Sequence, residues 1–580
     1  MLKANYLDVI TRNQPVSDDP ANNTQGSLSS DFDKKAPATA ASKSSKKSKS
    51  KSKAKNKKKL ESLDSPSLAP ESPSLEGIDS SELEKIMGMS EAEIKNLKAS
   101  EKKAISQKLK SQGNKFFSSK QFEQAIDYYS KALMFDENPV FYSNRAACYD
   151  ALEKYDLVIS DCTAALKLQP NYFKALLRRA KAYEATDNLR ESLYDFTVAC
   201  IIDDFKNAIP SEGVERVVKN LAEGEAKQIL STRKPRVPSK SFISGYFNSF
   251  VSNGARAVPE KSGDKLSKAE RLYNKSLDLL DTKDYAGSIS CVDSAIKEDI
   301  EKVNKKAAAD AYSLRGAYNF LKGSLDLAEA DFDHALTIDP NHVLTMYRKS
   351  NMFAEKKELD KSQELLKKAL EISPENAEGY FHSGQIYFIN QDFQSASEMY
   401  QKAIKCNSEY VYPYIQSGVA LFKLGQVSAA IETFNNAMVK FPNRSDLYNY
   451  YGEVLAENNG GSEAIAAFDK SIKIDKLNPL PYVNKALTLF QTSANYENAF
   501  GLIKQALDAD PECELAVAAL SQVYLQLGMF EDSLEMLNRA VQLAKSEEEL
   551  VSTITFRETT SAQYKFITEH PEMVSKLGRA

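Results

Sequence analysis

A repeat of 34 residues runs through most of this 580-residue chain and constrains its fold more than any other feature. A small residue followed by an apolar one recurs at that spacing, with one step of 35, at Ala335, Ala369, Ala403, Ala437, Ser471, Ala506 and Ala540. A second small-residue series keeps the same register at Gly316, Ser350, Gly384, Gly418, Gly452, Ala486 and Ser521. Because the apolar positions follow helical spacing and small residues let helices approach closely, each period is predicted to be a pair of packed helices.

Several periods close with a proline, which ends a helix, as at Pro340, Pro374, Pro442 and Pro511. A helix-turn-helix unit of this length is typical of the tetratricopeptide repeat, so the predicted fold class is an all-α superhelix, or α-solenoid. The register also runs through Gly113, Ala146 and Ala180. We therefore predict a three-repeat domain over residues 96–207, and an array of about eight repeats with a capping helix over residues 267–580.

Two segments lack the repeat. Residues 1–95 are rich in Ser, Lys, Ala and Pro and poor in aromatic residues, which predicts a disordered tail. Its stretch 34–59 holds twelve lysines and no acid, and is interpreted as a solvated linker or, alternatively, as a segment attracted to an anionic membrane surface or nucleic acid. Residues 208–266 are predicted to be a helical or irregular connector. Its aromatic side chains are expected to pack against another part of the protein or, alternatively, to form a binding motif of their own; they are Phe242, Tyr246, Phe247 and Phe250.

Composition argues against catalysis and metal binding. The formal net charge is −4, the six cysteines form no CxxC motif, and the four histidines stand at no metal-ligand spacing. There is no GxxxxGK phosphate loop, and the repeats use nearly all of the folded length, which leaves no room for a catalytic domain. We predict no enzyme activity, no catalytic residue, no cofactor and no metal. Binding of nucleic acid is not expected either, since no basic folded face is indicated.

The first helices of the three N-terminal repeats carry a set of cationic and amide residues at positions predicted to face the groove. They are Lys110, Asn114, Asn144, Lys174 and Arg178. Two lysines, one arginine and two amides together suit a dianion, and a peptide that ends in aspartate presents two close carboxylates. The alternative is five solvated polar side chains on a helical surface.

The corresponding groove positions of the long array are mostly apolar. They are Tyr347, Phe381, Gln385, Phe388, Ile415, Val419 and Phe422. Such a wall is predicted to accept a hydrophobic or amphipathic segment of another chain. The alternative is that these residues pack against the superhelix's own C-terminal helices.

The five polar residues resemble the clamp of tetratricopeptide domains that bind the Glu-Glu-Val-Asp termini of the seventy- and ninety-kilodalton heat-shock chaperones. From about residue 96 onward, with "GNKFFSSKQFEQAIDYYSKAL", "FISGYFNSF" and "STITFRETTSAQ", the chain resembles the seventy-kilodalton import receptor family of the mitochondrial outer-membrane translocase. The resemblance implies docking of those chaperones, binding of hydrophobic precursor proteins and work with translocase subunits on the cytosolic face of that membrane.

One departure from the family bears on location. Its members carry an N-terminal membrane anchor, whereas "MLKANYLDVITRNQPVSDDP" is too polar to span a bilayer. The sequence therefore leaves two alternatives, a family member whose anchor is missing from this sequence and a soluble cytosolic co-chaperone adaptor with the same clamp. It also leaves homodimerisation open.

Overall fold

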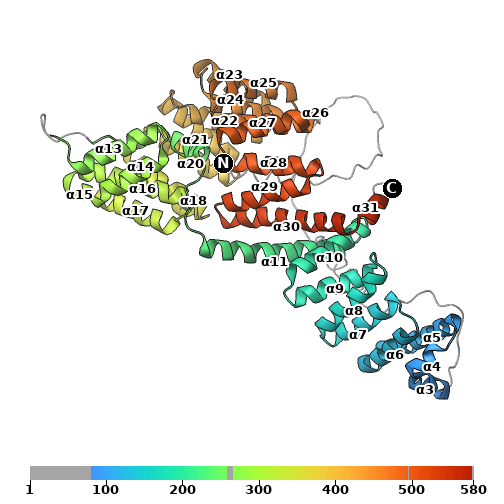
Figure 1. Ribbon diagram of the computed structural model, residues 1–580. Helices are drawn as coiled ribbons and strands as arrows, with labels where there is room; N and C mark the ends of the chain where they lie inside the picture. Colours follow the sequence, from blue (N-terminus) through green and yellow to red (C-terminus); the bar gives the residue numbers. More distant parts are fainter. Residues whose placement is uncertain (1–79, 258–264, 494–495, 578–580) are drawn as a thin grey trace, which may run out of the picture. The chain divides into compact units, whose positions relative to one another are not determined.

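The computed structural model describes residues 80–257, 265–493 and 496–577, and every regular element in these ranges is an α-helix (Figure 1). The predicted all-α repeat fold is confirmed. Within the part of the chain that is described, no helix combines the length and the apolarity needed to cross a membrane. The chain divides into two compact units, which we call the short unit, residues 80–226 with 554–577, and the long unit, residues 227–553.

The short unit contains three helix pairs that correspond to the three predicted N-terminal repeats. Its helices are α3 (Ser80–Gly88), α4 (Glu91–Lys95), α5 (Ala99–Ser118), α6 (Phe122–Phe135), α7 (Pro139–Ala151), α8 (Tyr155–Leu168), α9 (Phe173–Ala185), α10 (Leu189–Ile202), most of α11 (Ala208–Thr232), the later part of α30 (Glu547–Glu569), and α31 (Pro571–Leu577).

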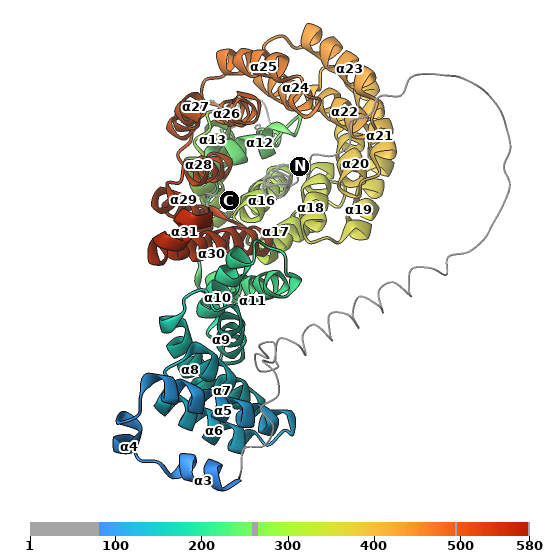
Figure 2. The ribbon, with the colours of Figure 1, turned by 90° about the vertical axis from the view of Figure 1, so that its right-hand side faces the viewer.

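The long unit contains the helix pairs of the second array. Its paired helices are α13 (Lys268–Asp281), α14 (Tyr285–Lys297), α16 (Lys305–Leu321), α17 (Leu325–Ile338), α18 (Val343–Glu355), α19 (Leu359–Ile372), α20 (Ala377–Ile389), α21 (Phe393–Cys406), α22 (Val411–Lys423), α23 (Val427–Lys440), α24 (Ser445–Glu457), α25 (Gly461–Ile474), α26 (Leu480–Ser493), α27 (Tyr496–Ala509), α28 (Glu514–Gln526) and α29 (Phe530–Leu543). Two shorter helices are α12 (Lys240–Asn248) and α15 (Ile300–Val303). The pairs follow one another around a curve, and α12 lies on its inner side (Figure 2).

The small residues of the repeat have a direct packing reason. A Cβ atom added at Gly113 would lie 2.7 Å from the ring of Tyr129, and one at Gly384 would lie 2.5 Å from the ring of Tyr400. In each pair the glycine lies on the first helix of a repeat and the ring on the second helix of the same repeat. The ring packs directly on the backbone of the first helix, where only a small residue leaves room for it. The small residue therefore recurs once in each repeat because each repeat contains this contact between its two helices.

The predicted tail boundary at residue 95 is wrong for its last residues. Residues 80–95 form α3 and α4, whose Ile86 and Ile94 are buried in one cluster with Leu109 and Phe141. Ser90 and Glu93 form a reciprocal capping box at the start of α4. The polar composition of the tail as a whole concealed the helix signal of the Ser90 and Glu93 capping box. The rest of the predicted tail, residues 1–79 with the lysine-rich stretch, lies outside the described residues.

The unit boundaries differ from the domains predicted from sequence in two respects. The connector begins with α11, an unbroken helix of 25 residues, and the boundary between the units falls within it. Pro210 is tolerated because it lies in the first turn, where backbone N–H groups have no intrahelical partner. The final helical residues, which were predicted to cap the long array, belong instead to the short unit from Ile554 onward.

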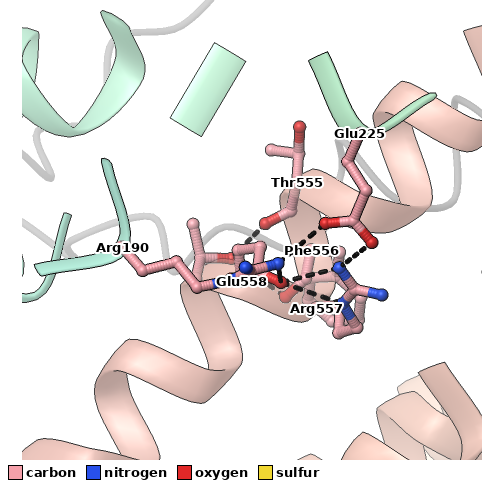
Figure 3. A network of polar contacts seen from close by, with 7 residues as sticks. Arg190, Glu225, Thr555, Phe556, Arg557 and Glu558 are labelled. Carbon is pink, nitrogen blue, oxygen red and sulfur yellow. Dashed lines mark hydrogen bonds and ion pairs between the residues drawn. The ribbon is translucent and has the colours of Figure 1, made fainter. Parts of the chain in front are cut away.

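A polar network explains part of this assignment (Figure 3). Glu558 of α30 accepts from Arg190 of α10, with Nε and Oε2 2.9 Å apart, and Glu225 of α11 accepts from Arg190 and from Arg557 at 2.8 and 2.7 Å. Two arginines and two glutamates thus alternate between three helices of the short unit. Such alternation compensates each charge as the helices come together.

Candidate functional site

The five predicted clamp residues lie on the first helices of the three repeats in the short unit. Lys110 and Asn114 lie one turn apart on α5, Asn144 lies on α7, and Lys174 and Arg178 lie one turn apart on α9. Their spacing along the helices is that of residues that share one face.

Asn114 and Asn144 are joined through one oxygen. The Asn114 Oδ1 atom accepts a hydrogen bond from the Tyr129 hydroxyl at 2.7 Å and another from Asn144 Nδ2 at 3.3 Å. With its oxygen engaged twice, the Asn114 amide presents its NH2 group as the remaining hydrogen-bonding group. Tyr129, which the sequence analysis did not select, therefore orients a residue of the predicted clamp.

Arg178 links the third repeat to the second. Its Nη1 atom donates to the Ser143 carbonyl at 3.1 Å and to the Ser143 hydroxyl at 2.8 Å. Burial, and secondly the nearby charge of Arg178, lower the pKa of Lys174. Burial also lowers the pKa of Lys110. Partly desolvated cations gain from an anion placed beside them, because it favours their charged form.

The structure refines which of the five residues a ligand can touch. The prediction had all five project into the groove, but Asn144 is fully buried and Arg178 is only 3% exposed. Lys110, Asn114 and Lys174 keep part of their surface accessible. Asn144 thus serves to hold Asn114, and Ser143, a second residue that the sequence analysis missed, holds Arg178. Ser143 occupies the register position of Lys110 in the preceding repeat, which is the signal that could have identified it.

The apolar positions predicted for the groove of the long unit divide into two groups. Tyr347, Phe381 and Ile415 are buried, at 0, 1 and 0% exposure, so the expectation of one open apolar wall needs correction. The others are partly exposed: Gln385, Phe388, Val419 and Phe422. Side chains from the connector explain part of the burial, since Phe250 lies in the same buried cluster as Tyr347.

A buried histidine marks the inner wall of the long unit. His382 on α20 is fully buried, and its ring centroid lies 5.0 Å from that of Phe250 and 5.3 Å from that of Tyr347. Burial lowers its pKa from 6.5 to about 4, although a hydrogen bond to Gln385 opposes the shift. His382 is therefore neutral at physiological pH.

We expect the stability of the long unit to fall on acidification because of His382. Unfolded chains bind a proton at this histidine below about pH 6.5, whereas the folded chain resists it until about pH 4. Between pH 7 and pH 5 the free energy of unfolding should drop by about 2 kcal/mol from this residue. Urea unfolding at both pH values measures the drop. His382→Phe should remove this contribution to the drop, whereas His570→Gln in the short unit should leave the drop unchanged. A drop between pH 7 and pH 5 that is as large in His382→Phe as in the wild type would contradict the prediction.

Comparison with known proteins adds a family relationship. Tetratricopeptide repeat families match residues 273–343, 344–376, 377–410, 415–479 and 492–553. The mitochondrial import receptor subunit TOM70 of Rattus norvegicus is 29% identical over 485 residues, which is 79% of each chain. The protein of that name from Saccharomyces cerevisiae is 27% identical over 520 residues, 83% of this chain and 84% of its own. The crystal structure of yeast Tom70 superposes with a TM-score of 0.53 at 26% identity, covering 83% of this chain and all of that one.

Proposed function

This chain is a homologue of the TOM70 subunits of the mitochondrial import receptor, and on that premise we propose that it has two binding activities. The short unit holds the Glu-Glu-Val-Asp termini of seventy- and ninety-kilodalton heat-shock chaperones. The long unit receives hydrophobic precursor proteins, which pass to the outer-membrane translocase. Both activities take place at the cytosolic face of the mitochondrial outer membrane. The relatives that span most of the chain are receptor subunits rather than enzymes.

The observation that carries the chaperone proposal is the placement of Lys174 beside Arg178. Both cations lie one turn apart on α9, and each is partly or wholly withdrawn from water. A terminal aspartate brings an α-carboxylate and a side-chain carboxylate close together, so it can accept directly from the accessible Lys174 while the buried charge of Arg178, held by Ser143, attracts it from behind. Lys110 and the Asn114 amide supply further donors on α5. Charge-assisted hydrogen bonds of this kind contribute about 1.5–3 kcal/mol each.

A titration of the full chain with a fluorescent peptide ending in Glu-Glu-Val-Asp tests the proposal. We expect Lys174→Ala to weaken binding by about tenfold or more, because it removes one charge-assisted bond from an accessible position. Amidation of the peptide's terminus should have a similar or larger effect, since it removes one carboxylate. Lys167→Ala is the matched control, because Lys167 is an exposed lysine on the neighbouring second helix α8.

Two results would contradict the clamp. Binding that is indifferent both to Lys174→Ala and to amidation would mean that the polar residues are a solvated helical surface. Equal losses in Lys174→Ala and Lys167→Ala would point to general attraction between a basic surface and an acidic peptide. A salt titration separates that second case, since exposed charges at long range are screened at high ionic strength.

A further inference from the structure

Residues 239–257, here called the inner segment, line the inner side of the long unit. The segment comprises Ser239, α12 and the nine residues that follow it, and α12 is visible within the curve of helix pairs (Figure 2). Its Phe247 and Phe250 are 3 and 5% exposed. Phe247 packs edge-on against Tyr318 of α16, with centroids 5.2 Å apart, and Phe250 packs against His382 of α20. The segment thus covers part of the wall that the sequence analysis predicted to be open, at Tyr347.

Acidic side chains of the repeats bind the backbone of the inner segment. Glu378 accepts from the Val251 N–H at 2.6 Å, and Asp510 accepts from the Ser241 N–H at 2.8 Å. Asp310 accepts from the Ala255 N–H at 3.3 Å, and the Tyr410 hydroxyl donates to the Ser249 carbonyl. Backbone groups are common to all polypeptides. The same wall could therefore form these bonds with a segment of another chain.

Arg348 of α18 contacts the inner segment by both hydrogen bonds and ring packing. It is fully buried, and its Nη2 atom donates to the Asn253 carbonyl at 3.3 Å and to Asn253 Oδ1 at 3.1 Å. Its guanidinium also lies over the rings of Phe247 and Phe250, at 5.8 and 5.4 Å from their centroids. A buried guanidinium needs such partners, so whatever occupies this wall must offer oxygen acceptors and aromatic faces.

Arg348 is the register counterpart of Arg178 in the short unit. Each precedes the small residue of its repeat by two positions, and each donates through Nη1 to a serine 35 residues earlier, Ser313 or Ser143. In the long unit this arginine is already bonded to oxygens of the inner segment. The segment thus stands where, in the short unit, a bound peptide terminus is proposed to stand.

We propose that the inner segment is a resident ligand of the groove in the long unit, and that an incoming precursor segment must displace it to bind. The inference rests on the proposed precursor-binding function and adds its regulation. The segment that displaces it is unfolded, apolar and carries two aromatic residues three positions apart, the spacing of Phe247 and Phe250. The observed affinity for precursors is then the intrinsic affinity of the empty groove multiplied by the fraction of molecules in which the inner segment has left the groove.

A labelled peptide with the segment's own sequence, SKSFISGYFNSFVSNGARA, tests the inference on the full chain. Phe250→Ala weakens the resident segment while leaving the wall intact, so this variant should bind the peptide at least tenfold more tightly than the wild type. Asn248→Ala is the matched control, because Asn248 lies on the same segment and is exposed. The same peptide with alanine at the positions of Phe247 and Phe250 should bind the Phe250→Ala variant weakly, which separates groove binding from attachment to a misfolded chain.

The outcomes distinguish this inference from the function on which it rests. Equal peptide binding by the wild type, Asn248→Ala and Phe250→Ala, or binding by none of them, would overturn the resident ligand. A hydrophobic carrier precursor made by cell-free translation is the second probe. If it binds the wild type and Phe250→Ala equally well, the inference fails while precursor binding stands. If the peptide behaves as expected but never competes with the precursor, the resident ligand stands and this groove is not the precursor site.

Discussion

Phe566→Ala is expected to lower the free energy of unfolding of the short unit by about 3–5 kcal/mol, the usual cost of removing a phenylalanine from a packed core. Phe566 lies on α30 near the end of the chain and is 2% exposed. It belongs to the buried cluster that contains Leu193, Phe196 and Val217 of the third repeat and of α11. A residue far away in sequence therefore completes the core of the N-terminal repeats.

Hydrogen exchange of the amides in α9 and α10 measures this effect locally, which suits a chain with two units. Gln563→Ala is the matched control, since Gln563 is exposed on the same helix. If Phe566→Ala exchanges no faster in α9 and α10 than Gln563→Ala does, α30 does not stabilise the repeats. We expect the opposite, because Tyr194 of α10 also donates to Glu569 at the end of α30, at 2.7 Å.

Asp195→Asn should destabilise the short unit by a similar amount, about 3–5 kcal/mol, by breaking a buried ion pair. The Asp195 carboxylate is fully buried and accepts two hydrogen bonds from Arg179, at 2.7 Å from Nε and 2.8 Å from Nη2. The remaining Nη1 atom of Arg179 donates to Thr163 at 3.0 Å. Without the carboxylate, the guanidinium keeps its charge in a site largely shielded from water.

The double variant Asp195→Asn with Arg179→Met separates loss of the pair from loss of packing. Removing both charges should recover most of the stability, because an apolar side chain of similar length can replace a buried pair at little cost. Urea unfolding, with exchange in α9 and α10 as the local probe, gives both values. A double variant as unstable as Asp195→Asn alone would show that the unpaired charge is not the cause.

The fold could be derived from sequence because its signals are local. Each repeat forms a contact between its two helices, so small residues such as Gly384, which faces Tyr400, and Gly418, which faces Phe434, recur 34 residues apart. The clamp residues could be selected for the same reason, since position within a repeat decides which face of a helix a side chain occupies. The exposure of each clamp residue could not be predicted from the sequence, because the burial of Asn144 depends on the neighbouring repeat.

Contacts between distant parts of the chain left no periodic trace and needed the tertiary structure. The packing of Phe566 in the short unit and of Phe250 in the long unit each joins segments that no repeat relates. Composition described residues 208–266 as a connector, yet part of it lies in a groove through backbone bonds to Glu378 and Asp310. By itself, the sequence determined the repeats, their number and the chemistry of their inner faces, because these follow from neighbours along the chain. Which inner faces of the repeats are covered, and by which segments, could be seen only in the tertiary structure, because this depends on where a curved array brings distant residues together.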